Sequence, residues 1–193
     1  VSELKNSYTS YISDPLAPVP YYPDITSRRK SDYLIIGQEF VEDREDVLTF
    51  VSPVLSEDMI VAGGITAELF ASISTTDADF VVKLIDVGPN GESEMMVRAN
   101  IMRGRYRNSF SAPEAFTPGK IERIEVNLTD VAHTFLAGHR IKVQIQSSWF
   151  PLFDRNPQQF IDIYKAGKED FVPSEIKIFH DAAHPSAIRF RTM

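Results

Sequence analysis

The sequence predicts an all-β fold, specifically a jelly-roll β-sandwich, and three observations support this prediction. Apolar and polar residues alternate with a period of two in many short segments from about residue 47 onward. Turns that contain glycine or proline separate these segments. No stretch of about ten residues between residues 60 and 146 keeps a helical period. Many short strands, frequent turns and few helices are typical of β-sandwiches such as the jelly roll.

The chain opens with a segment that is rich in proline and tyrosine. It contains the motif DPLAPVP, and clustered prolines favour an extended, polyproline-like path. Tyr21, Tyr22 and Tyr33 follow in the same irregular region. We therefore expect residues 1–33 to be a lead-in and residues 34–193 to form the jelly-roll domain.

Seven segments carry the features of strands. Residues 80–87 are apolar on nearly both faces, which predicts a central strand that is covered on each side. The alternating segments are 65–73, 97–101, 124–128, 141–146, 176–178 and 188–190. The best helix candidate is the segment from Pro157 to Lys165. Turns are expected at Gly63-Gly64, Pro89-Asn90-Gly91, Pro118-Gly119 and Gly138-His139.

Length and composition exclude several classes of protein. The 193 residues suit one well-buried core. A net charge of -7 argues against a nucleic-acid partner, because binding phosphates needs clustered Lys and Arg. The short basic runs at 28–30 and 103–107 are instead expected to be solvated faces or local salt-bridge partners. No apolar stretch approaches the length of about 18 residues that spans a membrane, and the absence of cysteine excludes disulfides and thiolate sites.

Sequence motifs for catalysis or metal binding are missing. The segment Gly91–Met95 comes nearest to the G-x-S-x-G nucleophile motif but lacks its second glycine. His180 and His184 are four residues apart, but no glutamate lies between them as in a zinc protease. The acidic clusters at 42–46 and 77–79 lack the spacing of a calcium loop. We therefore predict no catalytic residue, no metal site and no cofactor in this chain.

The segment 147–158, SSWFPLFDRNPQ, is unusual because it places the only tryptophan of the chain and two phenylalanines just after a predicted strand. Two interpretations stay open. The rings either anchor an interface with another domain or close the core of the sandwich itself, and different rings can do each. The candidate interface residues are Trp149, Phe150, Leu152, Phe153, Asp154 and Arg155.

Residues 133–158, HTFLAGHRIKVQIQSSWFPLFDRNPQ, resemble the last domain of the X-Pro dipeptidyl-peptidase and cocaine esterase (CocE/NonD) family of serine hydrolases. Within this family the chain is most similar to α-amino acid ester hydrolases and glutaryl cephalosporin acylases. Further similar blocks occur in the family's order and cover nearly the whole chain. They are 14–20, 42–55, 76–91, 101–110 and 182–190.

The resemblance implies a jelly roll of the galactose-binding-like type that follows an α/β-hydrolase domain. That upstream domain of the same polypeptide would be the partner and would carry the Ser, Asp and His of acyl transfer from esters, amides or X-Pro peptides. The triad would lie before Val1, and we expect these residues to be cut from a longer chain. By analogy, Tyr21, Tyr22 and Tyr33 are candidates for the rim of the acyl pocket. The amino ester hydrolase likeness is compatible with a periplasmic or extracellular location and with a homo-oligomer, and it leaves a cytoplasmic location open.

The main alternative is an independent carbohydrate-binding module. Jelly rolls often bind sugars on exposed aromatic side chains, and Trp149, Tyr21 and Tyr22 would then carry the binding. A flat tryptophan fluorescence response to a panel of glycans would exclude this alternative.

Overall fold

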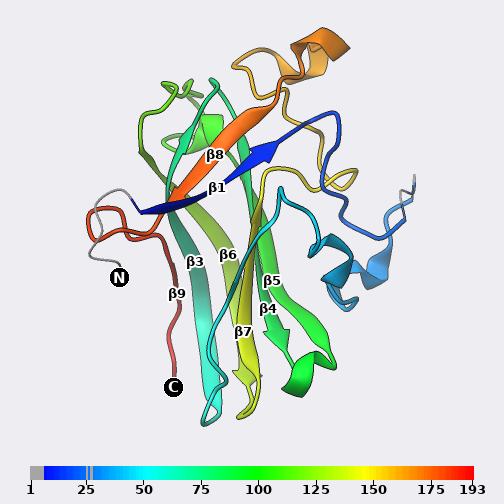
Figure 1. The fold of residues 1–193 in the computed structure, drawn as a ribbon, viewed down its shortest axis with the longest axis vertical. Helices are drawn as coiled ribbons and strands as arrows, with labels where there is room; N and C mark the ends of the chain where they lie inside the picture. The colour runs from blue at the N-terminus through cyan, green and yellow to red at the C-terminus, as the bar shows by residue number, and fades with distance from the viewer. Residues whose placement is uncertain (1–6, 25, 27) are drawn as a thin grey trace.

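The computed structural model describes residues 7–24, 26 and 28–193, and two antiparallel β-sheets dominate this part of the chain (Figure 1). The five-stranded sheet has the order β1-β8-β3-β6, with β9 also paired to β3, and the four-stranded sheet has the order β2-β7-β4-β5. The strands are β1 (Tyr8–Ser13), β2 (Leu48–Val51), β3 (Met59–Ile73), β4 (Asp79–Val87), β5 (Glu94–Arg103), β6 (Glu122–Phe135), β7 (Arg140–Gln146), β8 (Ser174–Phe179) and β9 (Ala187–Arg189).

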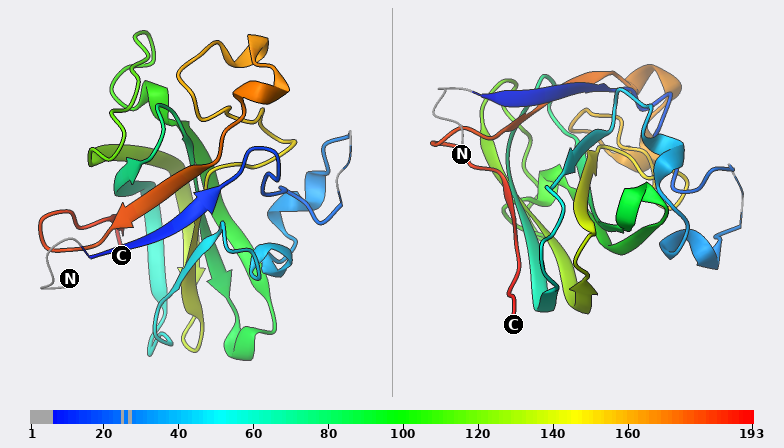
Figure 2. Two further views of the ribbon diagram at one scale, coloured as in Figure 1. Left: turned by 45° about the horizontal axis from the view of Figure 1, so that its top comes forward. Right: turned by 60° about the horizontal axis from the view of Figure 1, so that its bottom comes forward.

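The connections between the strands confirm the jelly-roll prediction. From β1 to β8 the chain changes sheet at every step except between β4 and β5, which pair as neighbours. The two sheets therefore face each other as a sandwich, as the views in Figure 2 show. Within the described residues, no helix is both long and apolar enough to cross a bilayer. The short 3-10 turns are η1 (Ser31–Leu34), η2 (Glu39–Val41), η3 (Pro89–Gly91), η4 (Gly104–Tyr106), η5 (Ile163–Lys165) and η6 (Lys168–Asp170).

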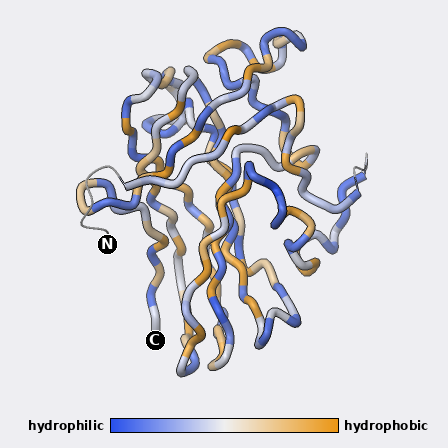
Figure 3. The backbone as a smooth tube through the Cα atoms, in the orientation of Figure 1, coloured by the Kyte–Doolittle hydropathy of each residue, from blue (hydrophilic) through white to orange (hydrophobic). Residues whose placement is uncertain are grey.

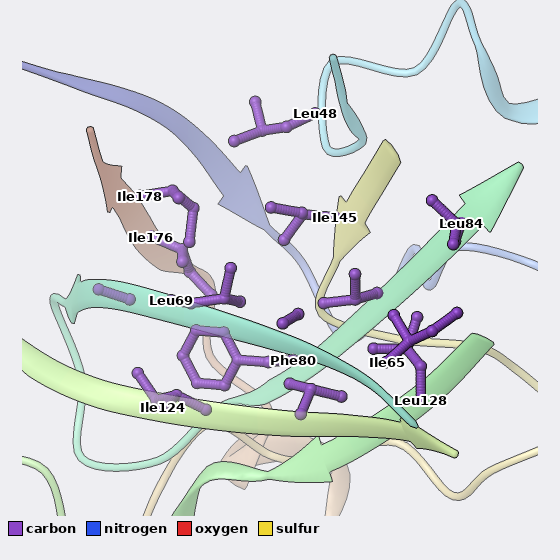
Figure 4. Packing of buried hydrophobic residues seen from close by; sticks show 14 of the residues in the cluster. Leu48, Ile65, Leu69, Phe80, Leu84, Ile124, Leu128, Ile145, Ile176 and Ile178 are labelled. Carbon is purple, nitrogen blue, oxygen red and sulfur yellow. The ribbon is translucent and has the colours of Figure 1, made fainter. Parts of the chain in front are cut away.

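The main core lies between the sheets. Leu69 of β3 and Ile124 of β6 pack there with Phe80 of β4, and all three side chains are buried (Figure 4). The period-two pattern that predicted the strands appears in Figure 3 as alternating colour along them. Burying one such side chain stabilises the fold by about 1.5–3 kcal/mol.

All nine residues of β4 are buried, which confirms the prediction of a central strand covered on each side. One face of β4 lies in the main core. The described residues between positions 14 and 47, namely 14–24, 26 and 28–47, lie over the outer face of the four-stranded sheet, and we call them the covering segment. Tyr21 of this segment packs against Val81 and Met96. The covering segment therefore gives β4 its second buried face.

The sequence missed the first strand. β1 lies inside the region that was expected to be an irregular lead-in, and it pairs with β8 from Tyr8↔Phe179 to Ser13↔Ser174. The segment YTSYIS is short and mostly polar, so its alternation, with Tyr11 and Ser13 buried, is easily overlooked. The jelly roll thus begins well before residue 34.

Two local predictions were also wrong. Gly63 and Gly64 lie within β3 rather than in a turn; Gly63 has a φ of 103°, and the register with β6 shifts just after, between Ile65 and Thr66. Glycine accepts this backbone conformation without strain, so the long strand can bend there. The helix candidate from 157 to 165 contains only the turn η5, because Gln158 has a positive φ of 65° and breaks the segment.

Candidate domain interface

The structure brings the two groups of candidate residues together. Pro20 and Phe150 form an isolated parallel bridge. Tyr21 N donates a hydrogen bond to Phe150 O, and Phe150 N donates one to Val19 O, both at 2.9 Å. Val19 N also donates to Ser148 Oγ at 2.8 Å. The tyrosine-rich segment therefore runs alongside the chain that leaves β7.

Rings from both segments form one aromatic cluster, which consists of Tyr21, Tyr22, Tyr33, Trp149 and Phe153. Tyr33 meets Trp149 edge-on with ring centroids 5.9 Å apart, and Tyr21 lies 5.8 Å from Tyr33. Phe153 stacks on Trp149 with ring centroids 6.0 Å apart. Such pairs stabilise a fold by about 0.5–1.5 kcal/mol beyond burial alone. Trp149 is only 4% exposed and Tyr21 only 1%, so these two rings close a second core.

The remaining candidate interface residues lie nearer to solvent. Phe153 is 37% exposed and Asp154 is also exposed, whereas Phe150 and Leu152 are half-buried. Arg155 is held within the domain, because its Nη1 donates to Pro15 O at 3.0 Å and its guanidinium lies 4.7 Å from the Phe171 ring. The core interpretation thus applies to Trp149. A contact between the outer residues and another domain stays a prediction.

A buried ionic network fixes the loop that carries these residues. Asn156 Nδ2 donates to Asp77 Oδ2 at 2.9 Å and to Asp79 Oδ1 at 2.8 Å. Arg105 Nε donates to Asp77 at 2.7 Å, and Arg103 pairs with Asp79 at 3.3 Å. Burial raises the pKa of Asp79 to about 6, although Arg103 and Asn156 oppose this shift. The basic run at 103–107 therefore supplies ion pairs, as predicted, and the carboxylates of 77–79 bind arginine and asparagine.

A hollow of about 400 Å³ lies next to the aromatic cluster, lined in part by Leu152 and Phe153. Phe110 and Tyr164 line the same hollow, although their side chains are 81% and 82% exposed. Two large aromatic residues this exposed at one place are typical of a binding surface rather than of a free surface. Neither residue was predicted from the sequence, because each lies in an irregular segment without a periodic pattern.

Other residues singled out in the sequence have structural roles. His180 contacts Ser7 Oγ at 3.0 Å and Thr9 Oγ1 at 3.2 Å, and so joins the end of β8 to β1. His184 does not converge with it, and its backbone N donates to Asp181 Oδ1 at 2.8 Å. Arg44 pairs with Asp46 at 2.7 Å, so a carboxylate of the acidic cluster at 42–46 binds arginine. In the described ranges, no three His, Asp or Glu side chains are placed to hold a metal ion.

The carbohydrate-binding alternative required exposed aromatic rings at Trp149, Tyr21 and Tyr22. Two of these rings are buried in the aromatic cluster, so they offer no face to a sugar. The structure also contains a largely apolar cleft of about 570 Å³ between the sheets, which reaches Leu69 and Val82. Of the histidines considered in the sequence, His180 lines this cleft.

The family described as the X-Pro dipeptidyl-peptidase C-terminal non-catalytic domain matches residues 6–189. The chain is 34% identical over 182 residues to a cocaine esterase of Rhodococcus sp., covering 94% of the chain and 32% of the relative. Among solved structures, an aminopeptidase from a marine sediment archaeon, Thaumarchaeota archaeon, superposes with a TM-score of 0.93 and 40% identity over 98% of the chain and 34% of its own. An α-amino acid ester hydrolase gives 0.93 and 37%, covering 100% of the chain and 33% of its own.

The chain thus spans about a third of the length of each of these relatives. In full-length homologues this domain accompanies a catalytic domain. The match over nearly all of the chain, together with the jelly-roll order of its strands, shows that the chain belongs to the family of X-Pro dipeptidyl-peptidase C-terminal non-catalytic domains of the CocE/NonD serine hydrolases.

Proposed function

We propose that this domain packs on the α/β-hydrolase catalytic domain of the same polypeptide and helps to shape its substrate pocket. The whole protein would cleave esters or amides by acyl transfer through a serine acyl-enzyme. The names of the relatives, an esterase, an amino acid ester hydrolase and an aminopeptidase, support this reaction class. The present domain would contribute a contact surface and part of the pocket wall, while the nucleophile would belong to the catalytic domain.

One observation carries the proposed contact surface: the exposed rings of Phe110, Phe153 and Tyr164 gather around one hollow beside the covering segment. Moving an exposed aromatic ring out of water stabilises an interface by about 1.5–3 kcal/mol. Tyr21, Tyr22 and Tyr33 lie in the neighbouring covering segment. Docking through the hollow would therefore bring these tyrosines close to the catalytic domain, where they would form part of the pocket rim.

The test compares surface variants in the polypeptide that contains both domains. The double variant Phe153→Ser, Tyr164→Ser should raise KM and lower the temperature at which activity is lost. Leu136→Ser is the matched control, because Leu136 is 48% exposed but precedes β7, whereas Trp149 follows it, so Leu136 lies at the other end of the sandwich. Equal behaviour of the double variant and the control would refute docking through this surface.

The reaction class has its own test. The present chain alone should neither hydrolyse aryl esters nor be labelled by a serine-directed phosphonate, whereas the polypeptide with both domains should do both. Turnover by the isolated chain that survives purification would overturn the proposal.

A further inference from the structure

The outer face of the four-stranded sheet carries polar side chains that the covering segment buries. Lys142, Gln144 and Gln146 alternate along β7, and Lys83 of β4 lies directly opposite Gln144 in the register. Lys83, Gln144 and Gln146 are each 0% exposed. Lysine and glutamine are rarely buried completely unless they are paired, so this layer needs a physical explanation.

Lys83 has no carboxylate partner among the described residues, although a buried cation is normally paired with one. Its Nζ donates to Gln38 Oε1 at 2.8 Å and lies 5.8 Å from the centroid of the Trp149 ring. The charge of Glu94 on β5 acts on Lys83, but the carboxylate of Glu94 binds Lys142, which also binds Glu42. Within the part of the chain that the structure describes, Lys83 therefore forms no salt bridge. Among the described residues, its one hydrogen-bond acceptor is the neutral amide of Gln38 in the covering segment.

The covering segment is attached to this polar layer by few contacts. Besides the bond from Lys83, Gln38 N donates to Glu94 at 3.2 Å, and Glu42 binds Lys142. Both amide atoms of Gln144 have no partner among the described residues. The layer thus contains polar groups that are better satisfied in contact with water. Opening the covering segment would hydrate them.

Protonation of Lys83 adds to this tendency. Burial lowers the pKa of Lys83 from 10.5 to about 7, although the charge of Glu94 opposes the shift. If the covering segment opens and water reaches the amine, its pKa returns toward the ordinary value. A group that binds its proton more tightly in the open state favours opening as the pH falls. The equilibrium constant for opening should therefore increase almost tenfold for each pH unit as the pH falls from about 10 to about 7. Below about pH 7 it should stay constant.

We propose that Lys83 is a proton-responsive positioning residue: uncharged, it lets the covering segment close on the four-stranded sheet, and charged, it favours release of this segment. Release would separate Tyr21 and Tyr33 from Trp149. If the tyrosines form the pocket rim, the pH would then control whether this rim is folded against the domain. This consequence for the substrate rests on the proposed function. The release itself is a property of this chain alone.

Hydrogen exchange of backbone amides tests the release. The amides of Tyr21 and Phe150 form the bridge between the covering segment and the chain after β7, and they should report its opening. Their protection factors, corrected for intrinsic exchange, should fall by roughly 15-fold from pH 8.5 to pH 7. Amides in the centre of β3 exchange through global unfolding, which exposes Lys83 as well, so they should stay far better protected than the amides of Tyr21 and Phe150 at both pH values. Equal protection of the two groups of amides would overturn the proposal, because the covering segment would then open only by global unfolding.

Two variants complete the test. Lys83→Met removes the titrating amine, and Lys83→Gln removes it too but keeps a hydrogen-bond donor for Gln38. Both variants should abolish the 15-fold change in protection. Either one is sufficient for the test if the other folds poorly. Lys177→Met on β8 is the control and should keep it, since Lys177 lies on the other sheet and pairs with Glu175. A wild-type protein without the pH dependence, or a Lys83→Gln protein that retains it, would refute the role of Lys83. Because these experiments use this chain alone, neither outcome bears on docking to the catalytic domain.

Discussion

Replacing Asn156 by leucine should destabilise the domain by about 4 kcal/mol. Asn156 is buried, and its one amide nitrogen donates to both Asp77 and Asp79, while its Oδ1 accepts from Gln158 N at 2.8 Å. A hydrogen bond to a charged group contributes about 1.5–3 kcal/mol and a neutral one about 1 kcal/mol. We take the lower value for the carboxylates, because Asp79 can relieve part of the loss by binding a proton near its pKa of about 6. Two such bonds and one neutral bond sum to about 4 kcal/mol.

Urea unfolding at pH 7, followed by tryptophan fluorescence, measures this loss. Trp149 is the only tryptophan and lies in the loop that Asn156 holds, so its emission reports the relevant region. Asn108→Leu is the matched control, because Asn108 is exposed and its side chain donates to Glu114, so it should change stability by less than about 0.5 kcal/mol. A loss below about 1 kcal/mol for Asn156→Leu would refute the reasoning that this network holds the loop.

Three further predictions concern charge and packing. Because burial raises the pKa of Asp79 from 3.8 to about 6, the stability of the folded state should fall as the pH rises through this range, by at most about 3 kcal/mol, and Asp79→Asn should flatten that part of the pH profile in urea unfolding. His133→Ala should lower the free energy of unfolding by about 1–3 kcal/mol, because His133 of β6 contacts the buried carboxylate of Asp86 on β4 at 2.8 Å and so joins the two sheets. An unchanged midpoint of thermal unfolding would contradict this. Ile65→Ala should cost about 2–5 kcal/mol, whereas Ile60→Ala on the same strand should cost little, because Ile65 is fully buried and Ile60 is 44% exposed; similar losses would show that the core assignment is wrong.

The sequence predicted the fold where the pattern of one segment determines its structure. The continuous apolar run at 80–87 predicted a central strand, and β4 is covered on both faces as expected. The strand β1 escaped detection because its partner β8 lies at the far end of the chain, and YTSYIS alternates too briefly to stand out. Gly63 was misread for a similar reason, since a glycine in a turn and a glycine at a strand bend look alike without the partner strand.

The candidate interface was only partly predictable. The composition of residues 149–155 pointed to buried aromatic area, but which rings lie inside depends on contacts with residues about 130 positions earlier. Lys83 gave a signal that the pattern alone could not interpret: a lysine in an otherwise apolar run marks either a strand edge or a buried charge. Only the position of Gln38 and the covering segment decides between these.

The pairing of β1 with β8 has a consequence for synthesis of the chain on the ribosome. About 160 residues separate these neighbouring strands, so at about 5–20 residues per second the first strand is made about 10–30 s before its partner. During this interval Tyr11 and the edge of β1 have no sheet to join, whereas the β4–β5 hairpin can form at once. Translation that stops before residue 174 would release a chain with a free strand edge, a known starting point for aggregation. Synthesis of β8 therefore ends the interval during which the nascent chain exposes the unpaired edge of β1 and can self-associate.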